Sequence, residues 1–277
     1  LKVFVTSRPE HPILEGFEQI EGEHKDVALH EIERCTIERD MALFFEDRLS
    51  RIRKKRKLED TWPGEIKTQA LVDMAMPLFI FAATVCRLLE DYRWDPDDSL
   101  NNILKRQYNN SQLDKTYLPV LDKLIGGQDQ QAQNELVKQF QQVVGIIVVL
   151  ESPLSIASLS KLINVKENLI RIRLDSFHSV LNIPSDNDKP VRMFHLSFRE
   201  FLLHPATREN TKLSVDGQST HRDLAYKCIA VMMDPQHGLR QNICGLPGYG
   251  TSRDDIGAER IERCFPAELR YATRYWV

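Results

Sequence analysis

Val191 to Leu203 reads Val-Arg-Met-Phe-His-Leu-Ser-Phe-Arg-Glu-Phe-Leu-Leu, and the interpretation of the chain starts from this stretch. A short apolar run that is typical of a strand ends at His195, and Ser197 predicts the N-cap of a following helix. A histidine at a strand-to-helix junction can meet a ligand beside the free amides of the helix N-terminus. It can equally be a packed structural residue, so this stretch alone leaves both interpretations open.

The sequence before this stretch has the order of a winged helix, which is three helices followed by a β-hairpin. The helices are expected at Gln133 to Leu150, from Ser152-Pro153 onward, and at Lys166 to Phe177. The last of them is expected to turn three residues inward, Leu169, Ile172 and Phe177. Strand-like runs at Ser179 to Ile183 and Val191 to Leu196 flank a polar loop, so they predict a hairpin with a wing.

Upstream lies a predicted helical domain, residues 61–127, which ends at Gly126-Gly127. Glu65 to Glu90 has a helical pattern that Pro77 interrupts, so two helices are expected to meet there. Further helices are expected at about Leu100 to Tyr108 and at Leu113 to Ile125. We place the winged-helix domain at residues 128–204 and a C-terminal helical segment at residues 205–277.

The N-terminal run Leu1 to Thr6 is rich in β-branched and aromatic residues, which predicts a buried, parallel strand. A parallel strand needs neighbours, so its partners are expected in a preceding segment. Residues 1–60 are therefore interpreted as the C-terminal remnant of an α/β core. The predicted fold class is mainly α, with this remnant at one end.

Composition limits the function classes. Of 277 residues, 42% are hydrophobic and 28% are charged, which fits a soluble globular protein. A net charge of −3 gives no global attraction to nucleic acid or to an anionic membrane. No apolar run is long enough to span a membrane. Five scattered cysteines without a Cys-x-x-Cys pair favour a reducing, cytoplasmic compartment.

Catalytic motifs are absent from the sequence. It contains no Gly-x-x-x-x-Gly-Lys-Ser/Thr phosphate loop, no Gly-x-Ser-x-Gly and no His-Glu-x-x-His. The chain as it stands is therefore expected to be non-catalytic and to hold no metal.

Two features leave room for nucleic-acid binding. A winged helix would present Lys166, Arg171 and Arg173 on its recognition helix. The wing from Ser185 to Lys189 is acidic, however, and phosphates would repel it. Seven of the ten residues from Arg48 to Lys57 are basic; we interpret them as a solvated helix end, with a localisation signal or a nucleic-acid or lipid patch as alternatives. A scaffold that binds no ligand is a third possibility.

Four motifs in order carry a family resemblance. They are Val3-Phe-Val-Thr-Ser-Arg-Pro-Glu10, Met74-Ala-Met-Pro-Leu-Phe-Ile-Phe-Ala-Ala-Thr-Val-Cys-Arg87, Phe194-His-Leu-Ser-Phe-Arg-Glu-Phe-Leu202 and Pro266-Ala-Glu-Leu-Arg-Tyr-Ala-Thr-Arg-Tyr-Trp-Val277. In this order they resemble the sensor-1 strand, the first helical domain, the winged-helix domain and the following segment of NACHT-type STAND NTPases. The resemblance is to the NLR-like fungal proteins of the heterokaryon-incompatibility type, and it covers essentially the whole chain.

The resemblance implies a nucleotide-switched signalling role with ADP or ATP as the ligand. Arg8 would sense the γ-phosphate, Pro77 would pack on adenine or ribose, and His195 would hydrogen-bond the β-phosphate of ADP. The intact protein would form homo-oligomers and bind protein partners through WD40, ankyrin or TPR repeats downstream. Because the Walker A and Walker B segments are missing here, the site implied for this chain is incomplete.

Overall fold

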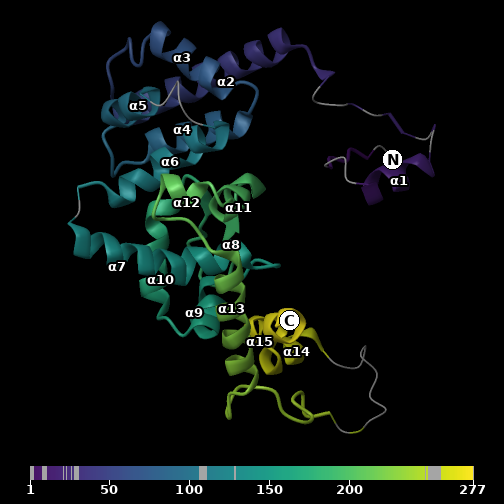
Figure 1. Ribbon diagram of the computed structural model, residues 1–277. Helices are drawn as coiled ribbons and strands as arrows, with labels where there is room; N and C mark the ends of the chain where they lie inside the picture. Colours follow the sequence, from purple (N-terminus) through teal and green to yellow (C-terminus); the bar gives the residue numbers. More distant parts are fainter. Residues whose placement is uncertain are drawn as a thin grey trace.

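The computed structural model describes residues 3–7, 11–20, 22, 24–25, 27, 31–105, 111–127, 129–246, 248 and 257–276. Within them the chain is mainly helical, as the sequence predicts. Figure 1 shows an elongated arrangement in which the helices within residues 34–104 lie at one end, the elements within residues 130–203 lie in the middle and the helices within residues 217–275 lie at the other end. Buried side chains from all three parts form one continuous hydrophobic core.

The first part, which we call the helical unit, consists of α2 (Arg34–Arg56), α3 (Glu65–Ala75), α4 (Phe79–Glu90), α5 (Pro96–Leu104) and α6 (Gln112–Ile125). The long helix α2 buries one stripe at helical spacing, Met41, Phe45, Leu49 and Ile52. It ends at Lys57, which adopts the left-handed conformation typical of a helix C-terminus. The predicted break is confirmed, because α3 and α4 are separated by a turn that contains the cis peptide bond Met76–Pro77.

The second part, the hairpin unit, begins with α7 (Gln130–Phe140), which continues through a π-helical turn into α8 (Ile146–Val149). The next elements are α9 (Ile156–Ile163), α10 (Glu167–Leu174), β1 (Leu181–Asn182), β2 (Arg192–Met193) and α11 (Leu196–Leu203). The two strands pair antiparallel, with Leu181 opposite Met193, and an isolated bridge joins Ser155 to Pro190. The predicted order of helices followed by a hairpin is therefore present.

Two details of the hairpin unit differ from the sequence prediction. Leu169 and Ile172 are exposed on α10, while Ile170 and Leu174 are buried in their place. The predicted inward face was wrong for these positions because the helix packs on the core through a neighbouring stripe. Phe177 is buried as expected.

The N-cap of α11 is also a correction. The helix begins at Leu196, and its N-cap is His195 rather than Ser197. Ser197 cannot cap because its hydroxyl is buried and turned toward the helical unit, while its backbone N–H donates to His195.

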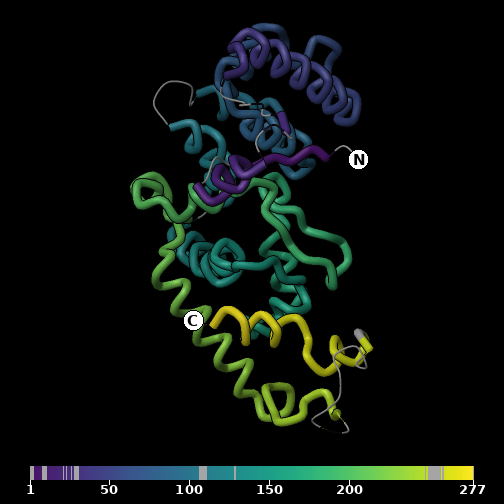
Figure 2. Tube along the Cα trace, turned by 90° about the vertical axis from the view of Figure 1, so that its right-hand side faces the viewer, coloured from purple at the N-terminus to yellow at the C-terminus, as the bar shows by residue number. Residues whose placement is uncertain are grey.

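The C-terminal part contains α12 (Thr207–Asn210), α13 (Gly217–Met232), α14 (Ala258–Cys264) and α15 (Ala267–Tyr275). Helix α15 lies across α13, as both views show (Figures 1 and 2). It is tied to α9 by an ion pair of 2.9 Å between Lys161 and the buried carboxylate of Glu268. The fold therefore extends the core beyond the hairpin unit.

The N-terminal residues behave differently from the body. Helix α1 (His11–Glu18) buries none of its side chains and stands apart in Figure 1. The strand predicted at Leu1 to Thr6 is not present in its described residues, since residues 3–7 form no strand. Among the described residues these positions have no partner strand, and an unpaired strand leaves its backbone groups unsatisfied.

Candidate functional site

The three predicted site residues have different outcomes. Arg8 lies outside the described residues. Pro77 is exposed in the turn between α3 and α4, and His195 is exposed at the start of α11. The hydrogen bonds of His195 run to Ser197 and, through it, to α6, so among the described residues they do not join it to Pro77.

The surroundings of His195 contain a short series of hydrogen-bonded side chains. Its Nδ1 accepts a hydrogen bond from the backbone N–H of Ser197 at 3.1 Å and lies 2.7 Å from the Ser197 hydroxyl. That hydroxyl lies 2.7 Å from the hydroxyl of Tyr117, which comes from α6 of the helical unit. Ser197 and Tyr117 are both buried, whereas the histidine ring is exposed. A solvent-facing histidine is thus connected to the interior by two buried hydroxyls.

Tyr117 explains how this site is held in place. Its ring packs against Phe198 and Phe201 of α11, with centroid distances of 5.1 and 5.3 Å. Burial raises the pKa of Tyr117, and the hydrogen bond to Ser197 opposes that rise only in part. The phenol therefore stays protonated and remains able to donate at neutral pH.

A second contact joins the two units beside this one. The guanidinium of Arg87, on α4, stacks over the ring of Phe194 at 3.9 Å from its centroid. Burial, and after it the nearby charge of Arg48, lowers the pKa of Arg87. Within the described part of the chain the Nη1 atom of Arg87 is buried and has no hydrogen-bond partner. The stacking on Phe194 therefore ties this cation to the hairpin unit.

Arg48 has a partner of its own, because its guanidinium lies 2.6 Å from a carboxylate oxygen of Glu90. The buried thiol of Cys86 lies in the same region, and burial raises its pKa to about 12. A thiol of this kind is protonated at neutral pH and is not a nucleophile. The region thus offers hydrogen-bond donors and cations, and Cys86 adds no thiolate to them.

Pro77 sits in a different setting. The neighbouring side chains Leu78 and Phe79 are partly exposed, and Phe79 meets Phe44 of α2 edge to face with a centroid distance of 6.0 Å. The amide of Gln112 donates to the carbonyl of Met74 and fixes the end of α3 against α6. The turn therefore presents an apolar surface that could pack on a flat group.

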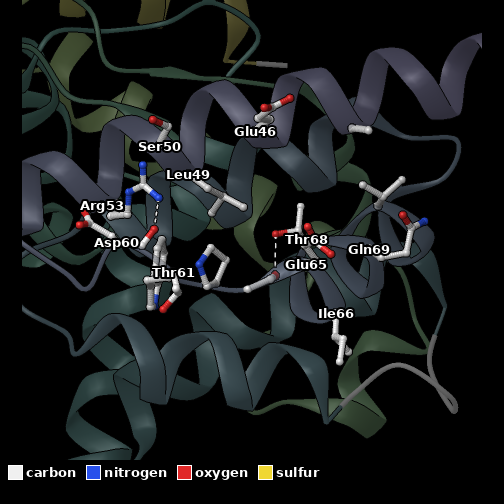
Figure 3. A pocket seen from close by; sticks show the side chains of 15 residues that line it. Glu46, Leu49, Ser50, Arg53, Asp60, Thr61, Glu65, Ile66, Thr68 and Gln69 are labelled. Carbon is white, nitrogen blue, oxygen red and sulfur yellow. Dashed lines mark hydrogen bonds between the residues drawn. The ribbon is translucent and has the colours of Figure 1, made fainter.

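A large groove was not foreseen from the sequence. It has a volume of about 890 Å³ and runs between α2 and the segment from residue 60 to residue 72 (Figure 3). In Figure 3 the guanidinium of Arg53 reaches the carbonyl of Asp60, and the Thr68 hydroxyl donates to the carbonyl of Gly64 at 3.0 Å. Trp62, Pro63 and Gly64 form part of the groove wall. Neither Pro77 nor His195 lines it.

The basic end of α2 is mostly engaged in structural contacts. Arg56 donates to the backbone carbonyls of Asp91 and Trp94, each at 2.7 Å, and stacks on Tyr92. Arg51 pairs with Asp47 at 3.0 Å. Arg56 therefore fastens the end of α2 to the turn after α4, whereas Arg51 pairs within the helix.

The arginines of α10 are engaged as well. Arg171 donates to the carbonyls of Pro184 and Ser185 at the base of the wing, at 3.3 and 3.1 Å. Arg173 donates to Gln142 at 3.3 Å. Arg171 and Arg173 are thus both engaged within the unit.

Two wider searches give negative findings for the described residues. They contain no group of three or more His, Cys, Asp or Glu side chains that could hold a metal ion. None of their helices is both long enough and apolar enough to cross a membrane. Comparison with known proteins adds no further guide to this site, since no protein-family model, curated protein or solved structure matches the chain.

Proposed function

We propose that this chain supplies the helical and winged-helix parts of a nucleotide-switched signalling NTPase of the NACHT, NLR-like class. The observation that carries the proposal is the exposed His195, which begins α11 and is tied through Ser197 to Tyr117 of the helical unit. A ligand that binds the imidazole would act on the junction between two structural units. Such a junction is where a ligand can shift the balance between a closed and an open arrangement.

The order of elements supports this assignment. A bridge at Ser155, two helices, a two-stranded antiparallel hairpin and a closing helix follow one another as in a winged-helix domain. The preceding helices α3–α6 would be the first helical domain, with Pro77 at the turn that faces the nucleotide. In this proposal ADP holds the closed state and its replacement by ATP releases it.

The chain is not proposed to hydrolyse nucleotide by itself. Phosphoryl transfer in P-loop enzymes depends on a phosphate loop and on carboxylates that position magnesium, and neither motif occurs in this sequence. We propose that both lie in an upstream segment, and that the intact protein works in the cytoplasm as a homo-oligomer with protein partners. Its role would be signal transduction in self or non-self recognition.

Reading the gene upstream of residue 1 is the first test. The proposal requires a Gly-x-x-x-x-Gly-Lys-Ser/Thr segment there, between a strand and a helix. An upstream sequence without this segment contradicts the proposal.

Nucleotide binding is the second test. A fluorescent ADP analogue is titrated into the chain extended by that upstream segment, and into its His195→Ala and His204→Ala variants. His204 is the matched control because it is also exposed and also accepts a backbone hydrogen bond through Nδ1, from Ala206 at 3.3 Å. Loss of one hydrogen bond to a charged phosphate should weaken binding about tenfold in the His195 variant only. Equal affinities in all three proteins would remove His195 from the site.

A further inference from the structure

The hydrogen atoms around His195 decide what kind of ligand it can take. The backbone N–H of Ser197 points at Nδ1 from 3.1 Å, and a backbone proton cannot be relocated. Nδ1 must therefore carry a lone pair rather than a proton. The hydroxyl of Ser197, 2.7 Å from the same atom, can then donate as well.

Tyr117 completes the arrangement from the other unit. If Ser197 gives its only hydroxyl proton to His195, its oxygen is free to accept from Tyr117, 2.7 Å away. The phenol is buried and protonated, so it can fill this role. Tyr117 thus donates to Ser197, and Ser197 donates to Nδ1 of His195. We call these two hydrogen bonds the row of donors.

We infer that Ser197 and Tyr117 are positioning residues that hold His195 as the neutral tautomer protonated at Nε2, so that its exposed face donates a hydrogen bond to an anionic oxygen and does not bind a metal ion. A neutral imidazole binds a metal through the nitrogen that lacks a proton. Here that nitrogen is Nδ1, which is occupied by Ser197. Metal binding at Nε2 would require a proton on Nδ1, against the backbone N–H of Ser197.

The hydrogen bonds of His195 also depend on the contact between the two units. Tyr117 belongs to α6, and Ser197 belongs to α11, so the row of donors exists only while these helices touch. Separation of the units would leave Ser197 free to rotate and would weaken the preference for one tautomer. The inference depends on the proposed function only in naming a phosphate oxygen as the acceptor.

The tautomer can be measured directly. The full chain is labelled with ¹⁵N-histidine, and its eight histidines are assigned by single substitution. Above the titration range of imidazole, wild-type His195 should show a pyridine-type Nδ1 and a pyrrole-type Nε2. Ser197→Ala should raise the fraction protonated at Nδ1 by about fivefold, since one hydrogen bond is lost.

Tyr117→Phe keeps the ring packing and removes only the hydroxyl, so it is the safer variant if Ser197→Ala folds poorly. It should shift the tautomer ratio of His195 in the same direction by a smaller factor. His204 should not change in either variant, nor should His195 change in Tyr226→Phe, which removes an exposed hydroxyl elsewhere. A proton on Nδ1 in the wild type, or a ratio that both variants leave unchanged, overturns the inference.

Ligand titrations separate this inference from the proposed function. Inorganic pyrophosphate and ADP should shift the Nε2 signal of His195, whereas zinc should affect other exposed histidines at lower concentration. Zinc bound at His195 first would overturn the inference even if ADP also binds. The expected tautomer without any response to ADP in the extended chain would leave the inference standing and remove the nucleotide from the proposed function.

Discussion

Val3 to Val5 and Val191 to Met193 are both short, β-prone runs, yet the structure treats them in opposite ways. Val3 is 74% exposed and belongs to no strand, whereas Val191 is 2% exposed beside a strand that pairs with β1. The second run has a partner strand about ten residues earlier and helices that cover it. The first has no partner among the described residues. A β-prone sequence therefore forms a strand only where the rest of the chain supplies one beside it.

The largest expected effect on stability comes from removing a buried aromatic side chain that follows the run Val191 to Met193. Phe198→Ala removes a buried ring that packs on Tyr117, so it should lower the free energy of unfolding by about 3–5 kcal/mol. Phe4→Ala is the counterpart, since Phe4 is 90% exposed, and it should change the value by less than about 0.5 kcal/mol. Urea unfolding of both variants measures the contrast. Similar losses would show that the N-terminal run is packed in solution.

A smaller loss tests the contact between the two units. Tyr117→Phe removes one hydroxyl and leaves the hydroxyl of Ser197 without its buried partner, which should cost about 1–2 kcal/mol of unfolding free energy. Tyr226→Phe, at an exposed hydroxyl, is the control and should have little effect. Equal stability of the two variants in urea would mean that the Tyr117–Ser197 hydrogen bond adds nothing to the junction.

The partly buried charge of Lys123 should make the free energy of unfolding depend on pH. Burial of Lys123 beside Trp94 lowers its pKa to about 8 from an ordinary 10.5. Below pH 8 the folded protein must hold a partly buried ammonium, which disfavours folding. Between pH 8 and 10.5 the folded protein has lost that proton while the unfolded chain still binds it, so the penalty disappears.

Wild-type stability should therefore rise relative to Lys123→Met between pH 7.5 and pH 10, by about 1 kcal/mol after allowance for the partial exposure of the group. The stability of Lys25→Met, at an exposed lysine, should change with pH as that of the wild type does. Urea unfolding at the two pH values makes the measurement. If the difference in unfolding free energy between wild type and Lys123→Met were the same at both pH values, the shifted pKa would be contradicted.

The smallest expected effect concerns the cap of α11. His195→Ala removes the acceptor for one backbone N–H and should lower the unfolding free energy by about 0.5–1 kcal/mol. His204→Ala removes a similar acceptor from a turn outside a helix start and should cost less. A larger loss in the His204 variant would contradict the assignment of His195 as the cap.

Much of the fold could be read from the sequence because it rests on local patterns. The break at Pro77 and the hairpin before α11 each involve residues close together in the chain. The inward face of α10 was missed because a short helix with apolar residues on two faces does not reveal which one meets the core. The groove beside α2 was missed because its walls come from separate segments.

The sequence by itself determined that this chain is mainly helical, that a hairpin precedes Phe198, and that His195 stands at a strand-to-helix junction. Only the tertiary structure decided that Ser197 turns inward, that Tyr117 meets it from a position 80 residues away, and that Val3 to Val5 stays unpaired. The physical reason is the separation along the chain over which each interaction acts. Backbone preference and apolar spacing act over a few residues, whereas the partner of a buried hydroxyl or of a strand edge is set by which distant segments pack together.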